Sequence, residues 1–400
     1  MLRVLTFTNL YPNAAQPRHG IFVEQRLLRL VQSGSIAARV IAPVASFPVR
    51  RGRFAPFAVA ARVAAAEHRH GIEVEHPRFP VVPGLSSWVN PVSMALCALP
   101  ALRRMRRESG EFDLIDAQFV YPDGVAGALL GALLGKPVLI TARGSDVNLA
   151  GRERIPRAWI RWAARRCAGF ITVSEALRDA LLALGVPTEQ LIVLRNGVDL
   201  ELFQPQDRER ARAELGISGP MLLAVGNLVE EKGHDIEIRA LAELAGVRLT
   251  IIGSGPEGEN LRRLAHECGV SERITWISEL RQPALVRYYA AADATVLASS
   301  REGMANVLLE SIACGTPVIA SAVGGNPEIV STSHAGVLMA ERTPAALVTA
   351  FRQLQRERPD SAQVRRHAQR FGWEETITRQ LRLFHDVASR GPAARGLRAA

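Results

Sequence analysis

The sequence is poor in lysine and cysteine and has no long apolar segment. Lys136 and Lys232 are the only lysines, and the other 47 basic residues are arginines. The four cysteines are widely spaced without a Cys-x-x-Cys pair, and no histidines have zinc-ligand spacing. We therefore expect neither disulfides nor a structural metal. The most apolar stretch, residues 125–135, is shorter than the ~20 residues of a membrane span, so it predicts a buried helix.

The N-terminus and the charge distribution indicate where the protein acts. The first residues alternate like a strand and lack the apolar core and cleavage site of a secretory signal, so we expect a cytoplasmic protein. Residues 1–200 carry 25 basic and 15 acidic residues, whereas residues 201–400 carry 24 of each. The excess positive charge is either a solubilising surface or a site for anionic partners, such as lipid headgroups at the inner face of the membrane. Nucleic acid is not expected, because no helix-turn-helix, zinc or RNP-type motif accompanies the charge.

Length and periodicity predict two domains. The chain has 400 residues, of which 48% are hydrophobic. This length exceeds that of a usual domain with a single hydrophobic core. Strand-like apolar runs alternate with helical patterns, and the alternation restarts after the turn-forming residues 196–199. The expected fold class is α/β, with Rossmann-like doubly wound domains at residues 1–200 and 201–389 that face each other across a cleft. Residues 390–400 are expected to form a flexible tail.

The most informative chemical motif is SREGMANVLLE, residues 300–310. A Gly-containing loop precedes a helix that is expected to run from Asn306 to about Gly315. Glu302 lies on the loop and Glu310 little more than one turn into the helix, so both carboxylates can point into one pocket. The amides and dipole at a helix start suit a phosphate, and a carboxylate suits neighbouring sugar hydroxyls.

A second strand-to-helix loop carries one of the two lysines. It comprises residues 225–233 and includes Gly226, Asn227 and Lys232. In a chain that prefers arginine so heavily, a lysine at this position indicates a point charge for a phosphate. The alternative is a surface lysine retained by chance.

A third loop matches a dinucleotide fingerprint. Residues 253–258 read G-x-G-x-x-G after a strand, and Glu279 follows at roughly the spacing at which such folds place an acid on ribose. An NAD oxidoreductase is therefore one alternative. Against it, Glu257 would lie beside the pyrophosphate, and the motif opens the second unit of its domain instead of the first.

Together these motifs resemble the family 4 retaining glycosyltransferases. The E-x7-E motif of that family matches Glu302 and Glu310, its diphosphate-binding lysine matches Lys232, and its Gly-Gly-Pro-Glu segment is similar to residues 324–328. In the first half, three segments are similar to this family: residues 13–24 with Gly20, residues 121–124, and residues 143–148. The last two resemble the subgroup of teichuronic acid and exopolysaccharide synthesis.

Two positions depart from the pattern of this family. Asn227 stands where many members have an arginine, which removes one charge from the expected diphosphate cradle. Arg143 stands where many members have a histidine that touches the donor sugar. Arg143 either restores the missing charge or changes which sugar is accepted.

The resemblance implies the GT-B fold and a hexosyl transfer with retention of configuration. The donor would be a nucleotide diphosphate sugar, with UDP the usual base in this family, and the acceptor a saccharide or lipid-linked molecule of bacterial surface polysaccharide synthesis. No cofactor and no metal are implied, in agreement with the absence of an Asp-x-Asp pair. The implied catalytic residues are Lys232, Glu302 and Arg143. The implied donor-binding residues are Gly20, Gly226, Asn227, Lys232, Gly253, Glu279, Gly303, Met304, Ala305, Asn306, Val307, Leu308 and Glu310.

Two alternatives remain beside the NAD enzyme. A nucleotide-sugar epimerase on the same fold would bind the same donor, although the first half lacks a histidine-rich active site. A catalytically degenerate donor-binding protein would explain the departures at Asn227 and Arg143.

Overall fold

The structure is a computed structural model that describes residues 1–49, 56–82, 84–144, 146–147, 153–357, 359–392 and 395–397. It divides into two compact units. Unit 1 comprises Met1–Leu194 and Glu374–Ala400, and unit 2 comprises Arg195–Trp373.

Unit 1 is built on an eight-stranded sheet with the order β10-β9-β8-β7-β1-β2-β5-β4. All neighbouring strands are parallel except β4 and β5. The strands are β1 (Leu2–Phe7), β2 (Ile36–Ile41), β4 (Ala66–Arg69), β5 (Ile72–Glu75), β7 (Leu114–Gln118), β8 (Val138–Ala142), β9 (Gly169–Thr172) and β10 (Leu191–Val193), with a separate parallel pair of β3 (Val44–Ser46) and β6 (Arg78–Pro80).

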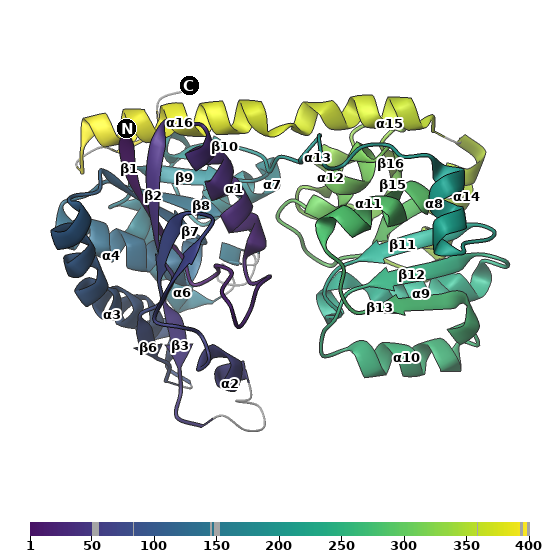
Figure 1. Cartoon of the computed structure of the whole chain (residues 1–400), viewed down its shortest axis with the longest axis horizontal. Helices are drawn as coiled ribbons and strands as arrows, with labels where there is room; N and C mark the ends of the chain where they lie inside the picture. The colour runs from purple at the N-terminus through teal and green to yellow at the C-terminus, as the bar shows by residue number, and fades with distance from the viewer. Residues whose placement is uncertain are drawn as a thin grey trace. The chain divides into compact units, whose positions relative to one another are not determined.

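The helices of unit 1 include the buried segment that the sequence predicts. They are α1 (Ile21–Gln32), α2 (Pro56–Ala60), α3 (Ser86–Ser109), α4 (Val125–Leu134), α6 (Arg154–Ala164), α7 (Glu175–Ala183) and most of α16 (Trp373–Arg390) (Figure 1). The first half of α4 is buried, and Leu133 near its end is exposed. No helix among the described residues is long and apolar enough to cross a membrane.

Unit 2 has a six-stranded parallel sheet with the order β13-β12-β11-β14-β15-β16. The strands are β11 (Met221–Val225), β12 (Arg248–Ile252), β13 (Ile274–Ile277), β14 (Ala294–Leu297), β15 (Val318–Ser321) and β16 (Gly336–Met339). The helices are α8 (Arg208–Leu215), α9 (His234–Glu243), α10 (Gly258–Glu267), α11 (Gln282–Ala291), α12 (Asn306–Ala313), α13 (Asn326–Ile329), α14 (Pro344–Glu357) and α15 (Ser361–Ala368).

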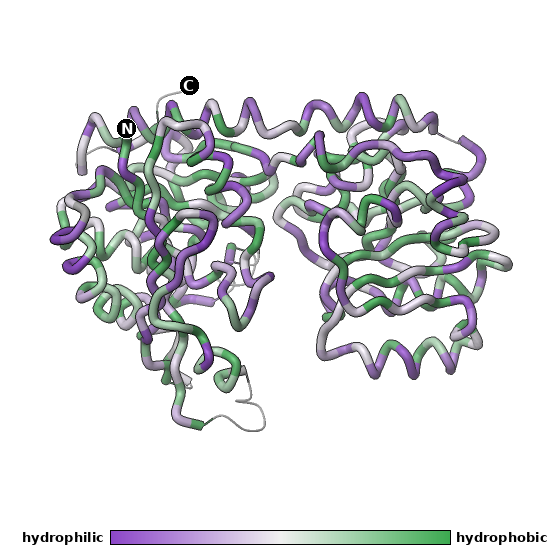
Figure 2. The backbone as a smooth tube through the Cα atoms, in the orientation of Figure 1, coloured by the Kyte–Doolittle hydropathy of each residue, from purple (hydrophilic) through white to green (hydrophobic). Residues whose placement is uncertain are grey.

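The central strands of unit 2, β11 and β14, are buried along their whole length because helices cover the sheet on both sides (Figure 1). Figure 2 shows these strands as mostly hydrophobic, whereas α10 alternates between hydrophobic and hydrophilic residues. Strand order reverses between β11 and β14, which is the kind of position where open α/β sheets bind ligands. The sequence therefore predicted the α/β class and the parallel sheets correctly.

The assignment of the C-terminal helix to the second domain was wrong. Residues 374–389 belong to unit 1, although α16 begins at Trp373 in unit 2. The buried guanidinium of Arg26 donates to Oε1 of Gln380 on α16 at 2.7 Å, and Phe384 is fully buried. The sequence did not show that this helix contacts Arg26, which lies far away in the sequence.

The expected flexible tail is bonded to unit 1 where the structure describes it. The backbone N–H of Leu397 donates to the carbonyl of Glu189 at 2.6 Å, and Arg395 donates to the carbonyl of Arg165 at 3.1 Å. Residues 393–394 and 398–400 lie outside the described residues.

Candidate active site

A lysine–glutamate ion pair lies at the carboxyl ends of the two central strands of unit 2. Lys232 follows β11 and Glu302 follows β14, and these strands are neighbours in the sheet. Lys232 Nζ lies 2.6 Å from Oε1 of Glu302, which also accepts a hydrogen bond from the Ser299 hydroxyl at 2.7 Å. The side chains of Lys232 and Glu302 are 25% and 12% exposed, so the ammonium can reach a ligand.

Glu310 lies deeper and has different partners. The Tyr289 hydroxyl donates to its Oε2 at 2.8 Å, and the Gln282 amide donates to its Oε1 at 3.2 Å. Burial raises the pKa of Glu310 to about 7, although both hydrogen bonds oppose the shift. Glu310 and Glu302 share no hydrogen-bond partner among these contacts, so the expectation of one common pocket stays a prediction.

The helix start at Asn306 agrees with the sequence prediction. Ala305 is the N-cap and provides no side-chain cap, and Gly315 beyond the end has the expected positive φ of 78°. The Leu308 N–H already donates to the Ala305 carbonyl at 3.1 Å, so it is not one of the open amides. The amides of Asn306 and Val307 at the first turn remain the candidates for a phosphate.

Two loops are locked together beside this helix. Gly324 has a φ of 52°, and a Cβ there would lie 2.0 Å from the Glu302 carbonyl oxygen. The Gly325 N–H donates to the Gly303 carbonyl at 2.9 Å. The Gly-Gly segment therefore holds the glutamate loop, in which Met304 and Ala305 are buried.

The G-x-G-x-x-G glycines pack against the lysine loop. A Cβ on Gly253 would lie 1.8 Å from the Gly226 carbonyl oxygen, and a Cβ on Gly255 would lie 2.4 Å from that of Leu228. These glycines are thus explained by a close backbone contact without a dinucleotide. Glu279 is exposed and follows β13, and Asn227 is also exposed.

A buried histidine supports the lysine loop, and sequence reasoning missed it. His234 Nδ1 lies 2.8 Å from Oε2 of Glu237, and its Nε2 lies 3.3 Å from the Asn227 carbonyl oxygen. Burial alone would lower the pKa of His234, but the Glu237 carboxylate and the hydrogen bonds raise it overall. The His–x–x–Glu spacing on a helix was the signal that could have identified this pair.

Arg143 and Gly20, the two site residues predicted in the first half, belong to unit 1. The Arg143 guanidinium donates to Oε1 of Gln118 and lies 5.4 Å from the Phe22 ring. Burial lowers its pKa to about 10, so it stays a cation at neutral pH. Ser145 and Asn148 of the same motif lie outside the described residues.

Asp146 orders the loop that carries Arg143. Its carboxylate accepts from the backbone N–H of Val120 at 2.6 Å, Gly144 at 2.7 Å and Arg143 at 3.2 Å. Burial raises the pKa of Asp146 against the effect of these hydrogen bonds. Asp146 lies in the segment 143–148 that the sequence analysis identified, but its contact with Val120 could not be predicted.

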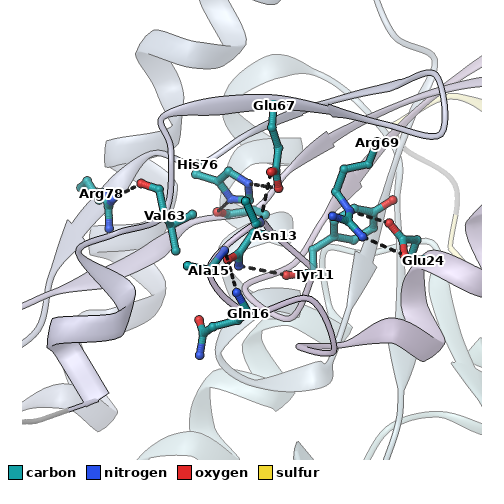
Figure 3. A network of polar contacts seen from close by, with 12 residues as sticks. Tyr11, Asn13, Ala15, Gln16, Glu24, Val63, Glu67, Arg69, His76 and Arg78 are labelled. Atoms are coloured by element: carbon teal, nitrogen blue, oxygen red, sulfur yellow. Dashed lines mark hydrogen bonds and ion pairs between the residues drawn. The ribbon is translucent and has the colours of Figure 1, made fainter. Parts of the chain in front are cut away.

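The Gly20 loop is held by a polar network in unit 1 (Figure 3). Glu67 accepts from the backbone N–H of Ala14 and contacts Nε2 of His76, both at 3.2 Å. Gly20 has a φ of 73°, and a Cβ there would lie 2.2 Å from the Leu10 carbonyl oxygen. Only glycine fits this approach, which explains the residue without a ligand.

Among the described residues, no group of three or more His, Cys, Asp or Glu side chains could hold a metal ion. The arrangement in unit 2 offers one ammonium, the N–H groups of a helix start and two carboxylates. These groups suit a ligand with both a phosphate and hydroxyls.

The chain is similar to known proteins in both sequence and fold. Residues 207–371 match the family "Glycosyl transferases group 1", and residues 36–202 match "Glycosyltransferase Family 4". The chain is 34% identical over 334 residues to a D-inositol 3-phosphate glycosyltransferase of Acidothermus cellulolyticus. The match covers 75% of this chain and 73% of that protein.

Two solved structures have the same fold. Sucrose-phosphate synthase from Thermosynechococcus elongatus matches with a TM-score of 0.79 at 21% identity and covers 98% of this chain and 100% of its own. Anabaena HepE in complex with UDP-glucose matches with a TM-score of 0.72 at 20% identity and covers 97% of this chain and 100% of its own.

Proposed function

Because the chain belongs to family 4 of the glycosyltransferases, a family of retaining GT-B enzymes, we propose that it transfers a sugar from a UDP-sugar to an anionic or lipid-linked acceptor. The observation that carries this proposal is the Lys232–Glu302 pair beside the N-terminus of α12. The UDP-glucose complex of HepE supports the choice of donor. The subgroup of surface polysaccharide synthesis stays a prediction.

The chemistry requires positive charge at the leaving group. When the bond from sugar C1 to phosphate breaks, negative charge builds on the diphosphate and the sugar gains oxocarbenium character. In the proposed complex, the Lys232 ammonium contacts the diphosphate instead of Glu302. The diphosphate also accepts hydrogen bonds from the backbone N–H groups of Asn306 and Val307. Arg143 is proposed as a second cation that stabilises the negative charge of the leaving diphosphate.

The two carboxylates would then bind hydroxyls. We place Glu310 at the ribose, where hydroxyl donors would favour its ionised form. Glu302, released from Lys232, would accept from the transferred sugar together with the backbone of Gly303 to Asn306. No metal takes part in this scheme, and transfer is expected to continue in excess EDTA.

The acceptor side of the proposal rests on the charge of unit 1. Unit 1 carries 29 basic and 17 acidic residues, whereas unit 2 carries 20 and 22. The relative from Acidothermus, by its name, acts on a phosphorylated acceptor. A phosphate-bearing acceptor, free or attached to a lipid, is therefore the class that we propose.

Exposed apolar side chains support a contact with a lipid surface. β3 and β6 are parallel, so the chain leaves both at the same end, where Val49, Val82, Leu85 and Trp88 are exposed by 40% or more. Apolar side chains on a basic unit suit a bilayer with anionic headgroups. We propose that this end of unit 1 contacts the inner membrane face.

Turnover tests the proposed function. Purified protein is incubated with UDP-glucose or UDP-N-acetylglucosamine and with inositol phosphate or a lipid-diphosphate saccharide, and release of UDP is measured. We expect acceptor-dependent UDP release that EDTA does not abolish. Binding of UDP-sugars without any acceptor-dependent release would contradict the transferase assignment.

A further inference from the structure

The linker that enters unit 2, residues 195–207, contacts the predicted donor site directly. Asn196, which is 7% exposed, donates from its Nδ2 to Oδ1 of Asn306 at 3.0 Å. Asn306 is the first residue of α12. The neighbouring Arg195 donates from Nε to Oε2 of Glu328 at 2.7 Å, on the helix that follows the Gly-Gly segment. The linker therefore contacts both the first residue of α12 and the helix that follows the Gly-Gly segment.

The same linker is also fixed at the other end of α12. The Arg365 guanidinium donates to the carbonyls of Leu200 at 2.7 Å and Phe203 at 2.6 Å, and to that of Ala313, the last residue of α12, at 2.7 Å. A backbone hydrogen bond of 2.8 Å from Val198 to Phe371 holds the middle of the segment. The linker thus runs along α12 (Figure 1). It is bonded directly to the first residue of α12 and, through Arg365, to the last residue of α12.

The contact with Asn196 fixes the direction of the Asn306 amide. A side-chain amide has one oxygen that accepts and one NH2 group that donates, on opposite sides. With Oδ1 held by Asn196, the NH2 group is the part of Asn306 left for other partners among the described contacts. It adds a neutral hydrogen-bond donor beside the backbone amides of the helix start, where an anion is favoured.

We propose that Asn196 is a positioning residue of the donor site, which orients the Asn306 amide so that its NH2 group is presented to the donor diphosphate. This inference rests on the proposed function. The lysine loop after β11 contains no arginine, and an oriented Asn306 supplies a donor after β14, the strand that neighbours β11. The residue acts through Asn306 and does not itself touch the donor.

Affinity for UDP, measured by calorimetry, tests the inference. In Asn196→Ala the Asn306 amide is free to rotate, and loss of one neutral hydrogen bond predicts binding weaker by about two- to tenfold. In Asn196→Asp only acceptors remain at residue 196, so Asn306 must turn its NH2 group inward and present oxygen, and the loss should be larger. Gln204→Ala, which removes an exposed amide from the same linker, is the matched control and should bind like wild type.

Separate readouts distinguish this role from a structural one. The melting temperature of each variant without ligand reports stability, and donor KM should rise more than kcat falls. Asn196→Leu, which is close to asparagine in size and has no side-chain donor, provides the same comparison if the alanine variant does not fold. Equal UDP affinity of Asn196→Ala and wild type would overturn the inference and leave the proposed function intact. Absence of binding by the wild type to UDP, GDP and ADP would overturn both.

Discussion

At the scale of single residues, the proposed sugar transfer depends on one lysine. Lys232 is one of two lysines in the chain, and its ammonium lies 2.6 Å from Glu302 at the carboxyl ends of β11 and β14. The sequence predicted this residue because arginine occupies almost every other basic position. It did not show the ion pair with Glu302, because the two residues are 70 positions apart and meet only through sheet topology.

Replacing Lys232 by alanine should mainly lower the rate of transfer. Loss of a positioned charge at the leaving group costs roughly 100- to 1,000-fold in kcat. Lys136→Ala removes the other lysine, which pairs with Glu111 in unit 1, and should leave kcat within about twofold of wild type. UDP release at saturating donor concentration measures both. Similar rates for Lys232→Ala and Lys136→Ala would exclude the proposed role.

The raised pKa of Glu310 predicts that the stability of the protein depends on pH. Its pKa is raised from 4.5 to about 7 in the folded protein, so its contribution is fully present below about pH 4.5 and is lost as the pH rises to about 7. A shift of this size corresponds to about 3 kcal/mol. In urea unfolding, the stability of Glu310→Gln relative to wild type should therefore increase between pH 5 and pH 7.5. A difference that stays constant over this interval would show that Glu310 ionises normally.

At the scale of elements, the sequence predicted the start of α12 and the loops around it. Local signals were sufficient there: an apolar strand, a glycine and a helical pattern. They could not show which N–H groups remain open: the N–H of Leu308, one of the implied donor-binding residues, donates to the Ala305 carbonyl. Nor did they show that Tyr289 and Gln282 of α11 hold Glu310, because those contacts are long-range.

The loop contact at Gly324 predicts a selective effect of substitution. In Gly324→Ala the new Cβ would meet the Glu302 carbonyl oxygen at 2.0 Å, so the glutamate loop must shift and UDP affinity should fall at least tenfold. Gly269→Ala is the matched control: Gly269 has a similar positive φ of 67°, but a Cβ there would have no atom within 4 Å. It should cost only the strain of about 1 kcal/mol and leave UDP affinity unchanged. Equal losses of affinity in the two variants would contradict the role of the contact.

At the scale of the whole molecule, the charge and the exposed apolar residues belong to unit 1. Each large apolar side chain that the described residues expose, such as Leu85 and Trp88, lies in that unit. Composition predicted the basic half, but the exposure of Trp88 within α3 depends on tertiary packing. For the same reason, the sequence could not assign α16 to unit 1, because an amphipathic pattern does not identify its partner.

Co-sedimentation with vesicles tests the proposed membrane contact. At low salt, the protein should bind vesicles of phosphatidylglycerol more strongly than vesicles of phosphatidylcholine, and Trp88→Ser should weaken binding severalfold. Trp276→Ser in unit 2 is the control for loss of a tryptophan and should bind like wild type. Equal binding to both kinds of vesicle, or none, would remove the lipid surface from the account.

The central claim is a nucleoside diphosphate site in unit 2. The most direct measurement is thermal stabilisation by UDP, GDP, ADP and NAD without added metal, in wild type and in Lys232→Ala. A ligand at 100 times its dissociation constant adds about 2.7 kcal/mol of stability. We expect stabilisation by UDP that is reduced in Lys232→Ala. Stabilisation by NAD alone, or by none of the four, would contradict it.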